Sequence, residues 1–170
     1  MKPRISWLKT SGYLVILASI SHFAVASAYA ATVVALGASN TYGKGVARNE
    51  AFPAQLEAIL RAKGLSVRVL NAGINADTTE GMLRRLDHAV PNGVSAVILQ
   101  PGGNDGRKGR PDRTAEIQSR LRARNIPVIM LPNNAFKGLP HQPDGKHLTP
   151  EGYRMIAESL ASQVAGAIGH

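Results

Sequence analysis

The stretch TVVALGASNT at residues 32–41 decides the fold, because an apolar, β-branched run stops at a glycine and is followed by a serine. The run at 32–36 is almost continuously apolar, which is typical of a strand covered on both faces of its sheet. Gly37 marks the end of this strand. Similar runs predict three further strands, at 67–70, 94–99 and 126–131.

Helical patterns alternate with these strands. They are predicted over residues 52–64, 77–90 and 114–125, and from Thr149 onward. Either Asp77 or Thr78 caps the second helix, and the last one opens with the order of cap, first-turn proline and acid. This alternation fits right-handed crossovers and predicts a single three-layer α/β domain with a parallel sheet of about four to five strands.

Residues 1–30 have the pattern of an export signal. A basic start is followed by an apolar run at 13–18 and by the small-x-small sequence Ala28-Tyr29-Ala30, which a signal peptidase cleaves. The apolar part is short and interrupted by serine and histidine, so it falls below the roughly 20 residues of a membrane-spanning helix. We expect cleavage after Ala30, a mature domain of residues 31–170 without a stable membrane anchor, and a periplasmic or secreted location.

Composition excludes several classes of protein. The 170 residues contain no cysteine, which rules out a disulfide scaffold, a thiolate zinc site and a catalytic cysteine. Three of the nine net positive charges lie in residues 1–30. No recognition motif or aromatic stacking set accompanies the others, so we expect no nucleic-acid partner.

Polar residues gather where the predicted strands end. Ser39 follows the first strand, Asn71-Ala72-Gly73 ends the second, Gly102-Gly103-Asn104-Asp105 follows the third, and Asp144 and His147 lie beyond the fourth. Ligands of parallel sheets bind beyond the carboxyl ends of the strands. One mouth of the sheet is therefore expected to collect a serine, free backbone N–H groups, a side-chain amide and an Asp/His pair.

The order of these four blocks resembles the SGNH hydrolases, the GDSL-type esterase and lipase superfamily. Ser39 matches the nucleophile, Gly73 the glycine of the second block, Asn104 the asparagine of the third, and Asp144 with His147 the terminal Asp-x-x-His pair. The segments at 71–79 and 147–153 are similar to the bacterial thioesterase, arylesterase and lysophospholipase branch. The resemblance runs from about Val33 to the end of the last helix.

The resemblance implies a flavodoxin-like fold and an exported serine esterase without a cofactor or metal. The enzyme would hydrolyse a small-molecule carboxylic ester or thioester, as an arylesterase, acyl-CoA thioesterase or lysophospholipase does, through an acyl-enzyme. His147 would take the proton of Ser39 while Asp144 orients the imidazole. The backbone N–H groups of Ser39 and Gly73 and the Asn104 amide would bind the oxyanion.

Two features depart from the family pattern. Ala38 stands where the family usually has aspartate, so the GDS tripeptide is GAS here, and we expect altered local hydrogen bonding. Only forty positions separate Asn104 from Asp144, and they accommodate one helix and one strand. Family members commonly have another helix and strand in this interval, which predicts a trimmed sheet with a shallower acyl site, or one completed by a partner subunit.

Other interpretations remain open from the sequence. A carbohydrate O-deacetylase of the same fold, or a non-catalytic module that binds an acyl or glycan ligand, would also fit the blocks. His141, Asp144 and His147 are spaced three apart like metal ligands, although no His-Glu-x-x-His motif supports a metal.

One basic cluster lies next to the predicted site. Arg107, Lys108 and Arg110 follow Asn104 directly, where they could attract an anionic substrate or a lipid head group.

Overall fold

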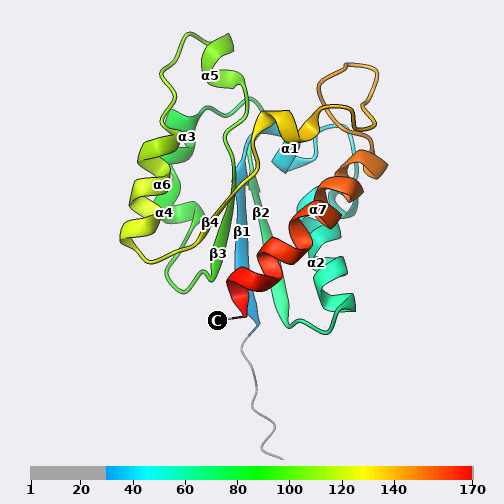
Figure 1. The fold of residues 1–170 in the computed structure, drawn as a ribbon. Helices are drawn as coiled ribbons and strands as arrows, with labels where there is room; N and C mark the ends of the chain where they lie inside the picture. Colours follow the sequence, from blue (N-terminus) through cyan, green and yellow to red (C-terminus); the bar gives the residue numbers. More distant parts are fainter. Residues whose placement is uncertain (1–29, 170) are drawn as a thin grey trace, which may run out of the picture.

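A computed structural model describes residues 30–169 and shows a four-stranded parallel sheet between two layers of helices (Figure 1). The strand order is β2-β1-β3-β4, with β1 at Ala31–Gly37, β2 at Val67–Gly73, β3 at Ala96–Gln100 and β4 at Val128–Met130. The predicted α/β fold class is confirmed. Apart from Ala30, the predicted export signal lies outside the described residues.

The helices cover both faces of the sheet. They are α1 (Ser39–Tyr42), α2 (Phe52–Ala62), α3 (Thr79–Arg84), α4 (Leu86–Ala89), α5 (Asn104–Arg107), α6 (Thr114–Ala123) and α7 (Pro150–Ile168), with 3-10 turns η1 (Arg48–Glu50) and η2 (Asn133–Phe136). Helices α2 and α7 lie on one face, whereas α3, α4 and α6 lie on the other (Figure 1). Within residues 30–169, no helix has both the length and the apolar character needed to cross a membrane.

Strand β1 is the centre of the core, because side chains on both of its faces are fully buried. Val33 and Ala35 belong to the cluster that includes α2 and α7. Val34 and Leu36 point the other way and belong to the cluster that includes α3, α4 and α6. The alternation follows the two-residue period of a strand, and it explains why residues 32–36 are apolar at every position but the first.

Several elements differ from the sequence prediction. Strand β3 covers Ala96–Gln100 instead of 94–99, and β4 covers Val128–Met130 instead of 126–131. The prediction of a single helix over 77–90 is wrong, since the helix is interrupted at Arg85, which separates α3 from α4. The Arg85 guanidinium turns to the carboxylate of Asp77, at 2.8 Å, and to the carbonyl oxygen of Gly37, at 3.2 Å. Strand β2 also continues to Gly73, beyond the predicted 67–70, because residues 71–73 pair with residues 35–37 of β1.

The interval between Asn104 and Asp144 is as compact as expected. It holds one full helix, α6, and one strand, β4, besides the short turns α5 and η2. The sheet therefore ends at β4, which has only three residues. The next segment leads directly into the loop that carries Asp144.

The start of α7 is fixed by the predicted cap. The Thr149 side chain accepts a hydrogen bond from the N–H of Gly152 at 3.2 Å, and Pro150 is the first helical residue. We expect Thr149→Ala to lower the free energy of unfolding by about 1 kcal/mol, the usual contribution of an N-cap, as measured by chemical denaturation. Ser162→Ala, at an exposed position of the same helix, is the control. Equal stability of the two variants would exclude a stabilising cap.

Candidate active site

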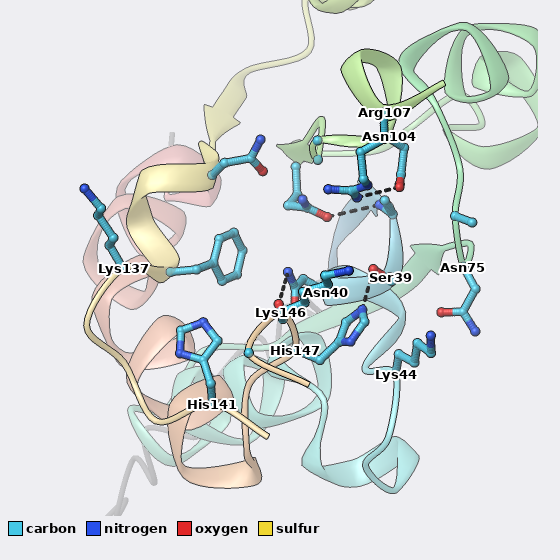
Figure 2. Close-up of a pocket in the computed structure, with 18 of the residues that line it drawn as sticks. Ser39, Asn40, Lys44, Asn75, Asn104, Arg107, Lys137, His141, Lys146 and His147 are labelled. Carbon is cyan, nitrogen blue, oxygen red and sulfur yellow. Dashed lines mark hydrogen bonds between the residues drawn. The ribbon is translucent and has the colours of Figure 1, made fainter. Parts of the chain in front are cut away.

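The candidate site lies at the carboxyl ends of β1 and β3, where the strand order reverses direction. Ser39 is the first residue of α1, directly after β1, and Asn104 is the first residue of α5, after β3. Asp144 and His147 come from the loop that precedes α7. A pocket of about 610 Å³ opens here, and Ser39, Asn104 and His147 all line it (Figure 2). This is the crevice in which ligands of open parallel sheets bind.

Ser39, His147 and Asp144 form a continuous hydrogen-bonded chain. The Nε2 atom of His147 lies 2.9 Å from Ser39 Oγ (Figure 2), and its Nδ1 atom lies 2.5 Å from Asp144 Oδ2. The second carboxylate oxygen of Asp144 accepts the backbone N–H groups of His147, at 3.0 Å, and of Lys146, at 2.9 Å. The His147 side chain is buried, so its ring is held between the two partners. The structure thus brings together the three residues that the sequence predicted to lie at one site.

Asp144 is held in its charged form. The hydrogen bond from the backbone N–H of His147, followed by the one from the imidazole, keeps the pKa of this carboxyl well below its usual range. A carboxyl whose pKa is lower in the folded than in the unfolded chain stabilises the fold above its ordinary pKa, and this contribution is lost only as the pH falls through the folded value. Asp144 therefore remains a carboxylate in mildly acidic solution.

The Asn104 amide is fixed by two neighbours. Its Nδ2 group donates to the carbonyl oxygen of Asp77 at 2.7 Å, and its Oδ1 accepts from the Arg107 guanidinium at 2.6 Å. The side chain is buried yet lines the pocket. An amide nitrogen carries two hydrogens, so the contact with Asp77 leaves one for a ligand.

Contrary to the prediction, Gly73 does not offer a free N–H group to the pocket beside Ser39. The N–H of Gly73 donates to the side-chain oxygen of Asn71 at 2.9 Å, and Gly73 is not among the residues that line the pocket. Its lack of a side chain has another cause, since a Cβ here would collide with the backbone nitrogen of Tyr42 in α1. Gly73 lets β2 and α1 pack closely.

Ala76, three residues after Gly73, borders the pocket instead. It lines the pocket and has a left-handed backbone with φ of 59°, which a residue with a side chain rarely adopts. Its carbonyl oxygen accepts from Lys108 Nζ at 2.6 Å, whereas its N–H has no acceptor among residues 30–169. Alanine carries no signal for this conformation, so the sequence could not reveal the exposed donor.

The metal interpretation finds no support in the contacts of His141. Its Nδ1 atom lies 2.6 Å from the carbonyl oxygen of Leu139. Across the described chain, no three His, Cys, Asp or Glu side chains are grouped as they would be around a metal ion.

Comparison with known families agrees with this geometry. A model of the GDSL-like lipase/acylhydrolase family matches residues 35–165, from the middle of β1 into α7. The chain belongs to the GDSL-like lipase/acylhydrolase family, the SGNH hydrolases. The match spans all four blocks, including the Ser39 and His147 loops at its two ends.

Individual relatives of this SGNH hydrolase include esterases. Esterase TesA of Pseudomonas aeruginosa is 31% identical over 110 residues, which are 61% of this chain and 55% of TesA, so the match spans about half of that relative. The esterase AlinE4, an SGNH-hydrolase family member, is 25% identical with a TM-score of 0.51, over 81% of this chain and 73% of AlinE4. The psychrotrophic esterase EstA of Pseudoalteromonas sp. shares the fold, with 18% identity and a TM-score of 0.66 over 82% of this chain and 99% of EstA.

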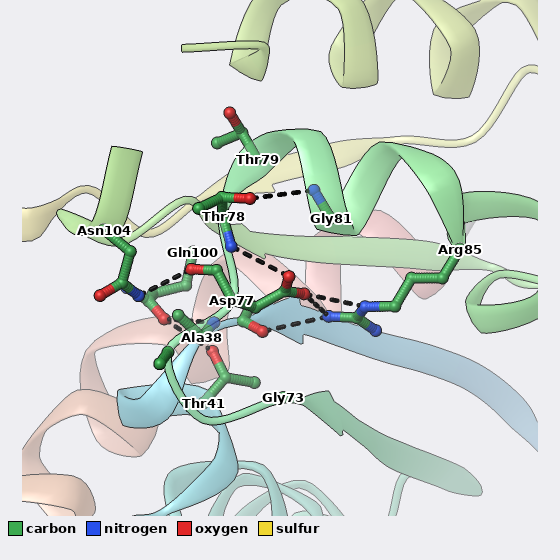
Figure 3. Close-up of polar contacts among 12 residues, drawn as sticks. Ala38, Thr41, Gly73, Asp77, Thr78, Thr79, Gly81, Arg85, Gln100 and Asn104 are labelled. Atoms are coloured by element: carbon green, nitrogen blue, oxygen red, sulfur yellow. Dashed lines mark hydrogen bonds and ion pairs between the residues drawn. The ribbon is translucent and has the colours of Figure 1, made fainter. Parts of the chain in front are cut away.

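A buried glutamine supports the turn that carries Ser39. Gln100, at the end of β3, accepts the backbone N–H of Ala38 and the hydroxyl of Thr41, both at 3.1 Å (Figure 3). Ala38 has no polar side chain with which to brace this turn, so a neighbouring strand supplies the acceptor.

A second set of contacts ties the Ala76 loop to the same place. Asp77 Oδ2 and the carbonyl oxygen of Gly37 share the Arg85 guanidinium, and the Asp77 carbonyl accepts from Asn104 (Figure 3). The ends of β1 and β3 and the loop after β2 are thereby connected through Asp77 and Arg85.

Proposed function

We propose that this SGNH hydrolase is an exported serine esterase that cleaves carboxylic ester or thioester bonds, of the arylesterase, acyl-CoA thioesterase or lysophospholipase type. The observation that carries the proposal is the unbroken chain from Ser39 Oγ through the His147 ring to Asp144, with its serine end in the pocket. Export rests on the pattern of residues 1–30.

The chain of contacts supports a two-step acyl transfer. In the first step, Ser39 Oγ bonds to the acyl carbon while its proton passes to His147 Nε2, and the Asp144 carboxylate stabilises the imidazolium. His147 then returns the proton to the departing oxygen or sulfur, and the acyl group remains on Ser39. In the second step, a water gives its proton to His147 and attacks the acyl carbon, and the proton moves to Ser39 Oγ as the acid leaves.

In this proposal, three donors stabilise the oxyanion of both steps. The backbone N–H of Ser39, at the first position of α1, has no intrahelical acceptor, and Asn104 retains a free hydrogen on Nδ2. The N–H of Ala76 is the third donor in our proposal, in place of Gly73. A donor that is already oriented costs no reorganisation when charge develops on the substrate oxygen.

We expect Asn104→Ala to lower kcat by about 10²–10³, the usual loss for one oxyanion donor, in steady-state assays with a chromogenic ester. Labelling of Ser39 by a fluorophosphonate should persist at a lower rate, because Ser39 and His147 are unchanged. Asn133→Ala, which removes another amide that lines the pocket, is the matched control and should retain most of the activity. A rise in KM with unchanged kcat would instead make Asn104 a ground-state binding residue.

The proposed function is tested with purified protein and a panel of nitrophenyl esters, acyl-CoAs, lysophospholipids and acetylated sugars. We expect hydrolysis of at least one of the first three classes and a fluorophosphonate adduct on Ser39. Hydrolysis confined to acetylated sugars would favour the carbohydrate deacetylase. Absence of both labelling and hydrolysis would favour the binding module.

A further inference from the structure

The rim of the pocket is a ring of positive charge. Four of its lining residues are cations, namely Lys44, Arg107, Lys137 and Lys146 (Figure 2). Among the described residues that line the pocket, none is an aspartate or glutamate. We call these four residues the cation ring. The Asp144 carboxylate lies behind His147 and is already shared by the imidazole and two backbone N–H groups.

The four residues of the cation ring come from separate loops that belong to the site. Each lysine is anchored by its backbone N–H group. Lys44 donates to the carbonyl oxygen of Ser39, and Lys137 to that of Asn134. Lys146 donates to Asp144 Oδ1. The guanidinium of Arg107 is held by Asn104 Oδ1 at 2.6 Å. The charges therefore start from fixed points around Ser39, although the lysine side chains themselves are exposed.

The charges of the cation ring are not neutralised within the described chain. None of its members has a carboxylate within ion-pair distance among residues 30–169. By contrast, Arg61, Arg120 and Arg154 each pair with a glutamate one turn away on their own helix. Cations gathered in a concave site without a counter-charge repel one another and attract an anion.

The arrangement favours phosphate over carboxylate. A single carboxylate is satisfied by one guanidinium fork, whereas a phosphate has more oxygens and up to two negative charges for cations that approach from several sides. We propose that the cation ring binds a phosphate group on the leaving part of the substrate, so that this enzyme selects phosphate-bearing esters or thioesters over neutral ones. This inference rests on the proposed esterase function and specifies its substrate class.

Two matched pairs of substrates test the proposal on the purified protein. Octanoyl-CoA is compared with the octanoyl thioester of N-acetylcysteamine, which has the same reacting bond without the nucleotide phosphates. Monomeric lysophosphatidate is compared with the monoacylglycerol of the same chain. We expect kcat/KM to be at least about tenfold higher for the phosphate-bearing member of one pair, and to decline as salt screens the charges. The pair that shows the preference distinguishes a soluble carrier from a lipid head group.

The double variant Lys44→Gln/Lys137→Gln removes two members of the cation ring and leaves Arg107 and Lys146, which adjoin Asn104 and His147. We expect the ratio of kcat/KM within the preferred pair to fall about 3- to 20-fold, since one exposed ion pair contributes up to about a factor of five. Lys63→Gln/Arg122→Gln removes the same charge from exposed positions that do not line the pocket. The ratio should not change in this control.

The experiments distinguish failure of the phosphate site from failure of the proposed esterase function. Equal kcat/KM within both pairs, or an equal fall of the ratio in the control variant, would overturn the phosphate site while leaving the esterase in place. A missing fluorophosphonate adduct together with no turnover of any of the four substrates would instead overturn the proposed function itself.

Discussion

Ser39→Ala is expected to abolish ester turnover and fluorophosphonate labelling together, with a loss of about 10⁴–10⁶ in kcat, as for the removal of other serine nucleophiles. The physical reason is that Ser39 Oγ is the atom 2.9 Å from His147 Nε2. No other serine lines the pocket among the described residues, so nothing can replace this hydroxyl. Labelling is followed by mass spectrometry of the intact protein, and turnover by release of nitrophenol.

The matched control for this variant is Ser119→Ala, at an exposed position of α6. Both variants should unfold at the wild-type temperature, because the lost hydroxyl of Ser39 contributes little to packing. A fluorophosphonate adduct on a different residue of the Ser39→Ala protein would show that the nucleophile has been misassigned.

His147→Ala is expected to produce a loss of similar size, about 10⁴–10⁶ in kcat. Without the imidazole no group accepts the Ser39 proton, so both turnover and the rate of fluorophosphonate labelling fall. The backbone N–H of residue 147 still donates to Asp144, so the loop retains that contact. Labelling rates of the two proteins are compared at neutral pH.

His88→Ala, on an exposed part of α4, is the control for the imidazole. It should label and turn over like the wild type. If the His147→Ala protein were as active as the control, His147 would be removed from the mechanism.

The sequence was sufficient to predict the three layers of helices and sheet. It also predicted the hydrogen-bonded series of Ser39, His147 and Asp144. The strands are short apolar runs whose burial is set locally, and the end of each strand fixes where the next loop begins. Ser39 follows β1 within two residues, and Asp144 and His147 share one loop, so little long-range information was needed to place them. The N-cap at Thr149 could also be predicted, because it depends only on residues 149–152.

The parts that could not be predicted depend on contacts between distant residues. The break at Arg85 coincides with a contact of its guanidinium with Gly37, 48 residues earlier in the chain. Gly73 looked like a close-approach glycine for substrate, but the group that approaches it is α1. The left-handed backbone of Ala76 is imposed by the surrounding loop, since alanine has no intrinsic preference for it.

Ser39 and His147 are in contact although they lie 108 residues apart in the sequence. The loop of His147 runs into α7, and α7 packs beside α2 in the same core cluster as β1. In a growing chain, Ser39 is therefore synthesised long before His147, the residue whose ring it contacts. The pair of Ser39 and His147 is complete only once α7 has packed onto the core, so a chain without α7 holds Ser39 without its hydrogen-bond partner.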